Sequence, residues 1–154
     1  MTTKITGANV NTLSLGVVNG VIQTTLAAAL EKVTISATAA TGTINYDLST
    51  QSILYYTSNA SANWTVNIRG NSGTTLNSMM ATGQSVTMTF LVTQGATAYY
   101  NSAVTIDGAS VTPEWLGGSA PSAGNINGVD VYTYTVIKTG SAAYTVFASQ
   151  SRYA

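Results

Sequence analysis

Apolar and polar residues alternate along most of this chain with the period of two that is typical of β-strands. The clearest case lies in residues 128–149, where the runs Val129–Ile137 and Tyr144–Ala148 are joined by the small polar connector Thr139–Ala142. Two such runs around a short polar connector predict a β-hairpin. Since both faces of the first run carry apolar or aromatic residues, the hairpin is predicted to lie inside a sheet.

The two faces of this first run differ in side-chain size. Val131, Thr133 and Thr135 share one face, whereas Tyr132 and Tyr134 share the other. We expect the smaller β-branched set to pack between sheets. The tyrosines are expected at a subunit interface, where their hydroxyl groups can find partners.

Further runs of strand character follow one another from Val33 onward. They cover residues 33–36, 43–48, 52–57, 63–70, 85–93 and 97–108. Asp107-Gly108 is predicted to be a tight turn, and residues 119–128, rich in small and turn-forming residues, a surface loop. With the hairpin this gives eight to ten strands, so the predicted fold is all-β, an antiparallel two-sheet β-sandwich of jelly-roll type.

The N-terminal residues do not sustain this alternation. Residues 1–20 are broken by Gly7, Gly16 and the turn signal Asn19-Gly20, which predicts an extended attachment arm. Two short helices are predicted, one within residues 26–32 and one at Leu76–Ala81 with Thr74 or Thr75 as its N-cap. The predicted organisation is therefore an arm over residues 1–32 and a β-sandwich over residues 33–154.

Composition narrows the range of functions. Only 6% of the 154 residues are charged, with five basic and five acidic residues, so a nucleic-acid partner is not expected. A free monomer normally carries charge on roughly a quarter of its surface. The low charge count therefore predicts that many copies pack together. No apolar run approaches the roughly 18 residues of a membrane-spanning helix, so membrane insertion is not predicted.

The chain contains neither histidine nor cysteine. This removes the commonest metal ligands, the usual general base and every Ser-His or Cys-His nucleophile. No metal, cofactor or catalytic residue is predicted. Four dispersed carboxylates, Asp47, Asp107, Glu114 and Asp130, leave open an enzyme with a carboxylate pair or a Ca²⁺ site.

Aromatic residues are the best candidates for a binding surface, because flat rings with a polar edge suit both protein interfaces and sugar stacking. The candidates for contact with a subunit or a glycan are Tyr99, Tyr100, Trp115, Tyr132 and Tyr134. Adjacent tyrosines in a strand point to opposite faces, which favours one core and one interface residue in each pair. Trp115 differs, because it lies between Pro113 and a double glycine, where loops carry function.

Five stretches carry a resemblance to a known family. They are TINYDLSTQSILYYT, NWTVNIRGNSGTTLNSMMATGQS, FLVTQGATAYYNSAVTIDG, PEWLGGSAPSAG and VDVYTYTVIKTGSAAYTVFASQSRYA. In these stretches the region from Val33 to Ala154 resembles a domain of virion structural proteins of tailed phages that infect marine cyanobacteria, often found at the C-terminus of fibre-like proteins.

The resemblance implies a non-enzymatic component of the phage particle surface, either a tail fibre or appendage or a capsid decoration protein. The short segment before the domain favours a small decorating or adaptor protein over a full-length fibre. By the same resemblance the protein is expected to be made in the host cytoplasm and to assemble in the virion with itself, as a homotrimer, and with other virion proteins. The alternative is a carbohydrate-binding, receptor-binding module that contacts a host surface glycan.

Overall fold

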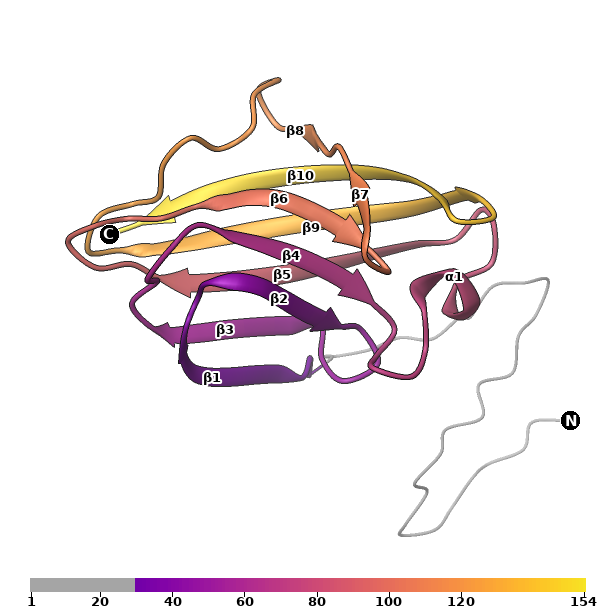
Figure 1. Cartoon of the computed structure of the whole chain (residues 1–154), viewed down its shortest axis with the longest axis horizontal. Helices are drawn as coiled ribbons and strands as arrows, with labels where there is room; N and C mark the ends of the chain where they lie inside the picture. The colour runs from indigo at the N-terminus through magenta and orange to yellow at the C-terminus, as the bar shows by residue number, and fades with distance from the viewer. Residues whose placement is uncertain (1–29) are drawn as a thin grey trace, which may run out of the picture. The chain divides into compact units, whose positions relative to one another are not determined.

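The computed structural model describes residues 30–154. The chain divides into two units, Met1–Leu30 and Glu31–Ala154, and every described strand and helix belongs to the second. That unit is built almost entirely of strands, which confirms the all-β prediction (Figure 1). Its elements are β1 (Val33–Ala39), β2 (Gly42–Asp47), β3 (Ile53–Ser58), β4 (Trp64–Arg69), α1 (Leu76–Met79), β5 (Ser85–Thr93), β6 (Asn101–Ile106), β7 (Ala109–Val111), β8 (Glu114–Trp115), β9 (Val129–Gly140) and β10 (Ala143–Tyr153).

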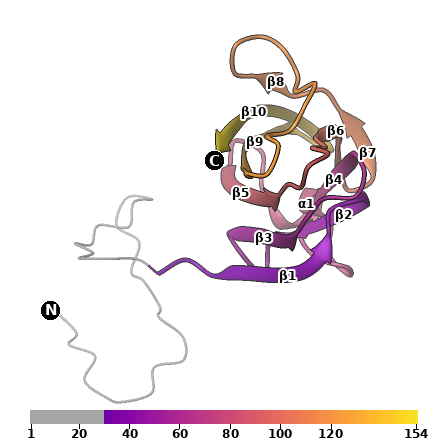
Figure 2. The same ribbon diagram turned by 90° about the vertical axis from the view of Figure 1, so that its left-hand side faces the viewer.

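The strands form two sheets that lie face to face (Figure 2). The six-stranded sheet has the order β1-β3-β5-β9-β10-β8, and the four-stranded sheet has the order β2-β4-β6-β7. From β1 to β6 the chain crosses to the other sheet after each strand. The neighbouring pairs β1–β3, β3–β5, β2–β4 and β4–β6 are therefore each separated in sequence by one strand of the other sheet.

This path makes the sheets mixed, so the prediction of antiparallel, jelly-roll pairing does not describe them. The pairs β1–β3, β3–β5, β2–β4, β4–β6 and β8–β10 are parallel, whereas β5–β9, β9–β10 and β6–β7 are antiparallel. Each crossing to the opposite sheet and back returns the chain in its original direction. Alternation along the sequence identifies the strands but carries no information about which strands become neighbours.

The predicted hairpin is confirmed as β9 and β10, which pair from Val129↔Tyr153 to Ala143↔Gly140. Ala142 in its turn has a φ of 50°, in the left-handed region. The predicted Asp107-Gly108 turn is also confirmed: both residues have positive φ and connect the paired residues Ile106 and Ala109. Such two-residue turns match the twist of the strands they join.

The core between the sheets contains a continuous series of aromatic rings. Tyr132 on β9 meets Trp64 on β4 across the gap, with ring centroids 5.7 Å apart. Trp64 in turn packs edge-on against Phe90 at 6.1 Å, and Tyr134 stacks on Tyr132 at 6.4 Å. Both tyrosines have an exposed fraction of 0%.

The expected assignment of faces on β9 is therefore wrong. The tyrosines fill the core, and Val131, Thr133 and Thr135 lie half-buried on the opposite side of the sheet. Packed sheets are about 10 Å apart, and long flat rings reach across this gap better than short β-branched side chains do. The same inward side of the hairpin includes Val136 and Val146.

Helix α1 connects β4 to β5, and Thr75 is its N-cap, accepting a hydrogen bond from Ser78 N. The carboxylate of Asp107 accepts further hydrogen bonds from the backbone N–H groups of Leu76 and Asn77, at 2.7 and 2.9 Å. This satisfies N–H groups that a helix leaves free at its start. The predicted arm over residues 1–32, and the helix predicted within it, lie outside the described residues except for their last three positions.

Candidate functional site

Five strands of the six-stranded sheet, β1, β3, β5, β9 and β10, present a surface without charged residues on the side opposite the core, which we call the outer face of this sheet. Strand register places matching side chains of neighbouring strands in rows across this face. One row contains Ile35, Tyr55, Leu91 and Val131, and the next contains Val33, Ile53, Thr89, Thr133 and Ser149. A third row contains Thr87, Thr135 and Phe147. The outward positions of β1, β3, β5, β9 and β10 carry no charged residue.

Several apolar side chains of this outer face are open to solvent. Ile35 is 68% exposed and Phe147 is 50% exposed. The hydroxyl groups of Thr87 and Thr135 lie 2.9 Å apart and hydrogen-bond to each other, so they partly satisfy themselves without water. A broad surface of aliphatic, aromatic and paired hydroxyl groups is suited to contact with another macromolecule.

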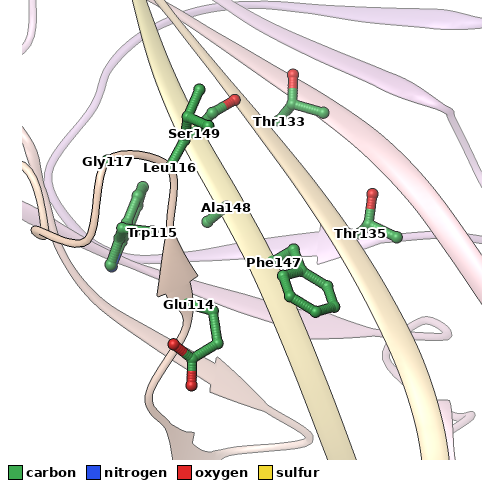
Figure 3. A pocket seen from close by; sticks show the side chains of 9 residues that line it. All are labelled: Glu114, Trp115, Leu116, Gly117, Thr133, Thr135, Phe147, Ala148 and Ser149. Carbon is green, nitrogen blue, oxygen red and sulfur yellow. The ribbon is translucent and has the colours of Figure 1, made fainter.

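A groove of about 480 Å³ lies at the β8 end of this face (Figure 3). Figure 3 shows Thr133 and Thr135 on β9, Phe147 on β10 and Glu114 on β8 around it. Glu114 pairs with Phe147 in the parallel register of β8 and β10. The groove thus combines a half-exposed aromatic ring, hydroxyl groups and one carboxylate, the groups with which proteins bind sugars.

Trp115, predicted as a loop residue with a function, belongs to the two-residue strand β8 and is half-buried. Its ring packs edge-on against Tyr134, with centroids 6.3 Å apart and an interplanar angle of 71°. Trp115 also lines the groove, so one residue joins this surface to the core.

The other predicted aromatic candidates are not brought to the groove. Tyr99 and Tyr100 lie half-buried just before β6. The backbone of Tyr99 is held by the side chain of Gln94, which donates to Tyr99 O at 2.6 Å and accepts from Tyr99 N at 3.0 Å. Tyr132 and Tyr134 are fully buried, so they are available neither to a glycan nor to a second subunit.

Sequence reasoning missed Phe147, Thr133 and Thr135 as surface candidates. A signal for Phe147 was present, because it is a large apolar residue on the side of β10 that faces away from Val146 and Ala148. To recognise the two threonines as surface candidates, one must know which side of β9 faces the core. The expected assignment placed that side the wrong way round.

The four carboxylates occupy four different environments. Asp47 accepts a hydrogen bond from Arg69 Nε at 2.6 Å, Asp107 caps α1, and Glu114 lines the groove. Asp130 is fully buried. Among residues 30–154, no group of three or more acidic side chains is placed to hold a metal ion.

Asp130 forms a buried polar cluster with Gln94 at the start of β9. Its Oδ2 accepts hydrogen bonds from Gln94 Nε2 at 2.9 Å and from Asn125 N at 3.1 Å. Burial raises the pKa of the Asp130 carboxyl above its ordinary value, and these two hydrogen bonds partly oppose the shift. The cluster ties the loop before β9 to the end of β5.

The four-stranded sheet has a polar outer face with its own hydrogen bonds. Asn67 Nδ2 donates to Asn45 Oδ1 at 2.8 Å, and Thr105 Oγ1 donates to Asn67 Oδ1 at 2.8 Å. Gly108 N donates to the same Asn67 oxygen at 2.9 Å. These side chains therefore find their partners within the sheet.

Comparison of the chain with protein-family models, with curated proteins and with solved structures found no match. Within the part of the chain that the structure describes, no helix is both long and apolar enough to cross a membrane.

Proposed function

We propose that this chain is a non-enzymatic structural protein of a bacteriophage particle, placed on the particle surface as a tail appendage or a capsid decoration. The observation that carries the proposal is the uncharged outer face of the six-stranded sheet, with Ile35 and Phe147 at least half exposed. A face of this kind contributes most when it is covered by another protein surface. Proteins of an assembled virus particle are in such contact with their neighbours.

The resemblance of residues 33–154 to virion structural domains supports the same proposal. It adds that the chain forms a homo-oligomer, a trimer by analogy with fibre and decoration proteins, and contacts other virion proteins. The low share of charged residues agrees with a protein whose surface is largely covered in an assembly.

The test is the oligomeric state of the purified full-length chain. Sedimentation velocity should show a stable oligomer at micromolar concentration, with a mass that is a multiple of 15.8 kDa. A chain that sediments as a monomer throughout the micromolar range would contradict assembly as its function.

A second candidate function is carbohydrate binding, and the groove at β8 is the observation that favours it. Phe147 offers a ring for a sugar face, while Thr133, Thr135 and Glu114 offer polar groups to sugar hydroxyls. Binding to a glycan array that is lost in both Phe147→Ala and Glu114→Gln would favour this function. Retention of glycan binding in these variants would exclude the groove as its site.

A further inference from the structure

We propose that the outer face of the six-stranded sheet is the surface through which two copies of this chain associate. This inference rests on the proposed function as an assembling particle protein and names the surface and the partner. The partner is a second copy, held face to face with the first. Because both copies use the same face, this contact closes at a dimer, so the inference departs from the trimer that the resemblance implies, and a trimeric wild type would overturn it.

Charge is the first reason to expect a second copy. A surface that recognises a charged partner needs complementary charges, which the outward positions of β1, β3, β5, β9 and β10 do not provide. Over these five strands two identical faces can approach each other without like-charge repulsion, and the carboxylate of Glu114 lies beyond them on the edge strand β8. Self-association is therefore compatible with this face in a way that a charged binding surface would not allow.

The second reason is the apolar row of Ile35, Tyr55, Leu91 and Val131, which crosses four neighbouring strands. In a symmetric dimer the same patch is used by both copies, so the patch must be complementary to itself. A two-fold axis lying along this row places the row of one copy on the row of the other. The row with Thr89 and Thr133 would then face the row on the other side of the apolar row, which contains Thr93 and Val129.

Area is the third reason. Strands about 4.8 Å apart with a rise of about 3.3 Å per residue give five strands of about seven residues a planar area on the order of 600 Å². The relief of the side chains increases the contact area beyond this value. Two such faces bury about 1,200 Å² in total, the lower end of the range for stable protein interfaces, so the face is large enough for a stable contact.

The proposal is tested by a matched pair of threonine-to-lysine variants. Thr133 and Thr65 are both half-buried, both point outward, and both lie on strands that are paired on each side. Thr133→Lys places a charge on the proposed contact, whereas Thr65→Lys places the same charge on the outer face of the four-stranded sheet. Sedimentation of the two full-length variants and the wild type is compared over a range of concentrations.

Thr133→Lys should weaken self-association by about 100-fold or more, since the contact would strip the water from a lysine charge. Thr65→Lys should associate as the wild type does. Circular dichroism checks that both variants are folded. Should Thr133→Lys fail to fold, Thr89→Lys, at the paired position on β5, takes its place with the same expected loss of association.

The outcomes separate this inference from the proposed function. An oligomeric wild type with an equally oligomeric Thr133→Lys variant overturns the sheet face as the interface and leaves assembly standing. A monomeric wild type overturns both and leaves the face to a different virion protein or to a glycan. Loss of association in Thr65→Lys alone would move the contact to the four-stranded sheet and overturn the inference.

Discussion

The outer face of the four-stranded sheet and the outer face of the six-stranded sheet satisfy their side chains in different ways. On the former, Asn67 holds Asn45 and Thr105, and Asp47 pairs with Arg69. On the latter, rows of aliphatic and hydroxyl side chains have no charged neighbour within β1, β3, β5, β9 and β10, and Phe147 is half exposed. The polar side chains of the four-stranded sheet are paired with one another, whereas the outer face of the six-stranded sheet still exposes apolar area to water.

Under the proposed function, this difference lets one small β domain keep one sheet face in water and cover the other in an assembly. A ladder of side-chain hydrogen bonds holds a sheet surface in place without offering much to a partner, since its polar groups are already used. An uncharged apolar row gains free energy only when water is removed from it. The two outer faces therefore differ in the groups that still lack a partner. On the four-stranded sheet the polar groups are paired, and on the six-stranded sheet apolar groups remain exposed.

The largest effect on the free energy of unfolding is expected for a substitution on the inward side of β9. The packing of this side in the core leaves the other side of the strand on the outer face. Tyr134→Ala should lower the free energy of unfolding by about 3–5 kcal/mol, because it empties a fully buried ring site in the core. Thr133→Ala, one residue away on the outer face, should change it by no more than about 0.5 kcal/mol. Urea unfolding at a concentration where the chain is monomeric measures both. Equal losses of unfolding free energy in the two variants would contradict the placement of Tyr134 in the core and of Thr133 on the outer face.

Alkaline pH tests the same burial without mutation. Burial raises the pKa of Tyr46, Tyr132 and Tyr134 above the ordinary value of 10.0. The folded chain therefore resists an ionisation that the unfolded chain undergoes. The contribution of these tyrosines to stability is fully present below about pH 10. Above it, each tyrosine that ionises only in the unfolded chain lowers the free energy of unfolding by about 1.4 kcal/mol per pH unit.

Denaturation midpoints should accordingly decline between about pH 10 and pH 12, where tyrosines ionise in the unfolded chain and not in the folded one. Tyr46→Phe should make the decline shallower, because one of the three groups is removed. A midpoint that stays constant across this range would contradict the buried placement of the three tyrosines.

The hydrogen-bonded ladder of the four-stranded sheet should be important for stability but not for association. Asn67→Ala leaves Thr105, Gly108 N and the Asn45 side chain without their common partner. The expected loss is about 1–3 kcal/mol of unfolding free energy. Sedimentation should show an unchanged oligomer in this variant. Reduced association with unchanged stability would reverse the roles given to the two faces.

The smallest effect concerns two hydroxyl groups of the core. The hydroxyl of Tyr134 is buried and has no hydrogen-bond partner among the described residues, so Tyr134→Phe should be neutral or stabilise by up to about 1 kcal/mol. The hydroxyl of Tyr132 accepts from Asn101 N at 3.3 Å and from Gln150 Nε2 at 3.1 Å. Tyr132→Phe should therefore cost about 1 kcal/mol. Thermal melts of the two variants side by side distinguish them.

The local structure could be read from the sequence because it depends on short-range patterns. Alternation predicts β9 and β10, and the Asp107-Gly108 pair predicts the β6–β7 turn. The start of α1 was predicted with Thr74 or Thr75 as N-cap, and Thr75 takes that position. Strand neighbours could not be predicted, because β1 pairs with β3 only after the chain has visited the other sheet.

The candidate site was harder to predict for a related reason. Both sides of β9 are apolar enough for a core, and what decides between them is the partner across the gap, Trp64 on β4. A residue on another sheet leaves no trace in the local pattern of β9. Once Tyr132 and Tyr134 are assigned to the core, Thr133 and Thr135 must face outward beside Phe147.

Association through the outer face of the six-stranded sheet is tested most directly by hydroxyl-radical footprinting of the wild-type chain at a low and a high protein concentration. Phe147 on the outer face and Met79 on α1 are matched probes, with exposed fractions of 50% and 47%. Association through the six-stranded sheet predicts that oxidation of Phe147 and Ile35 slows on concentration while oxidation of Met79 does not. Unchanged oxidation of Phe147 and Ile35 in a sample shown to be oligomeric would contradict association through this face.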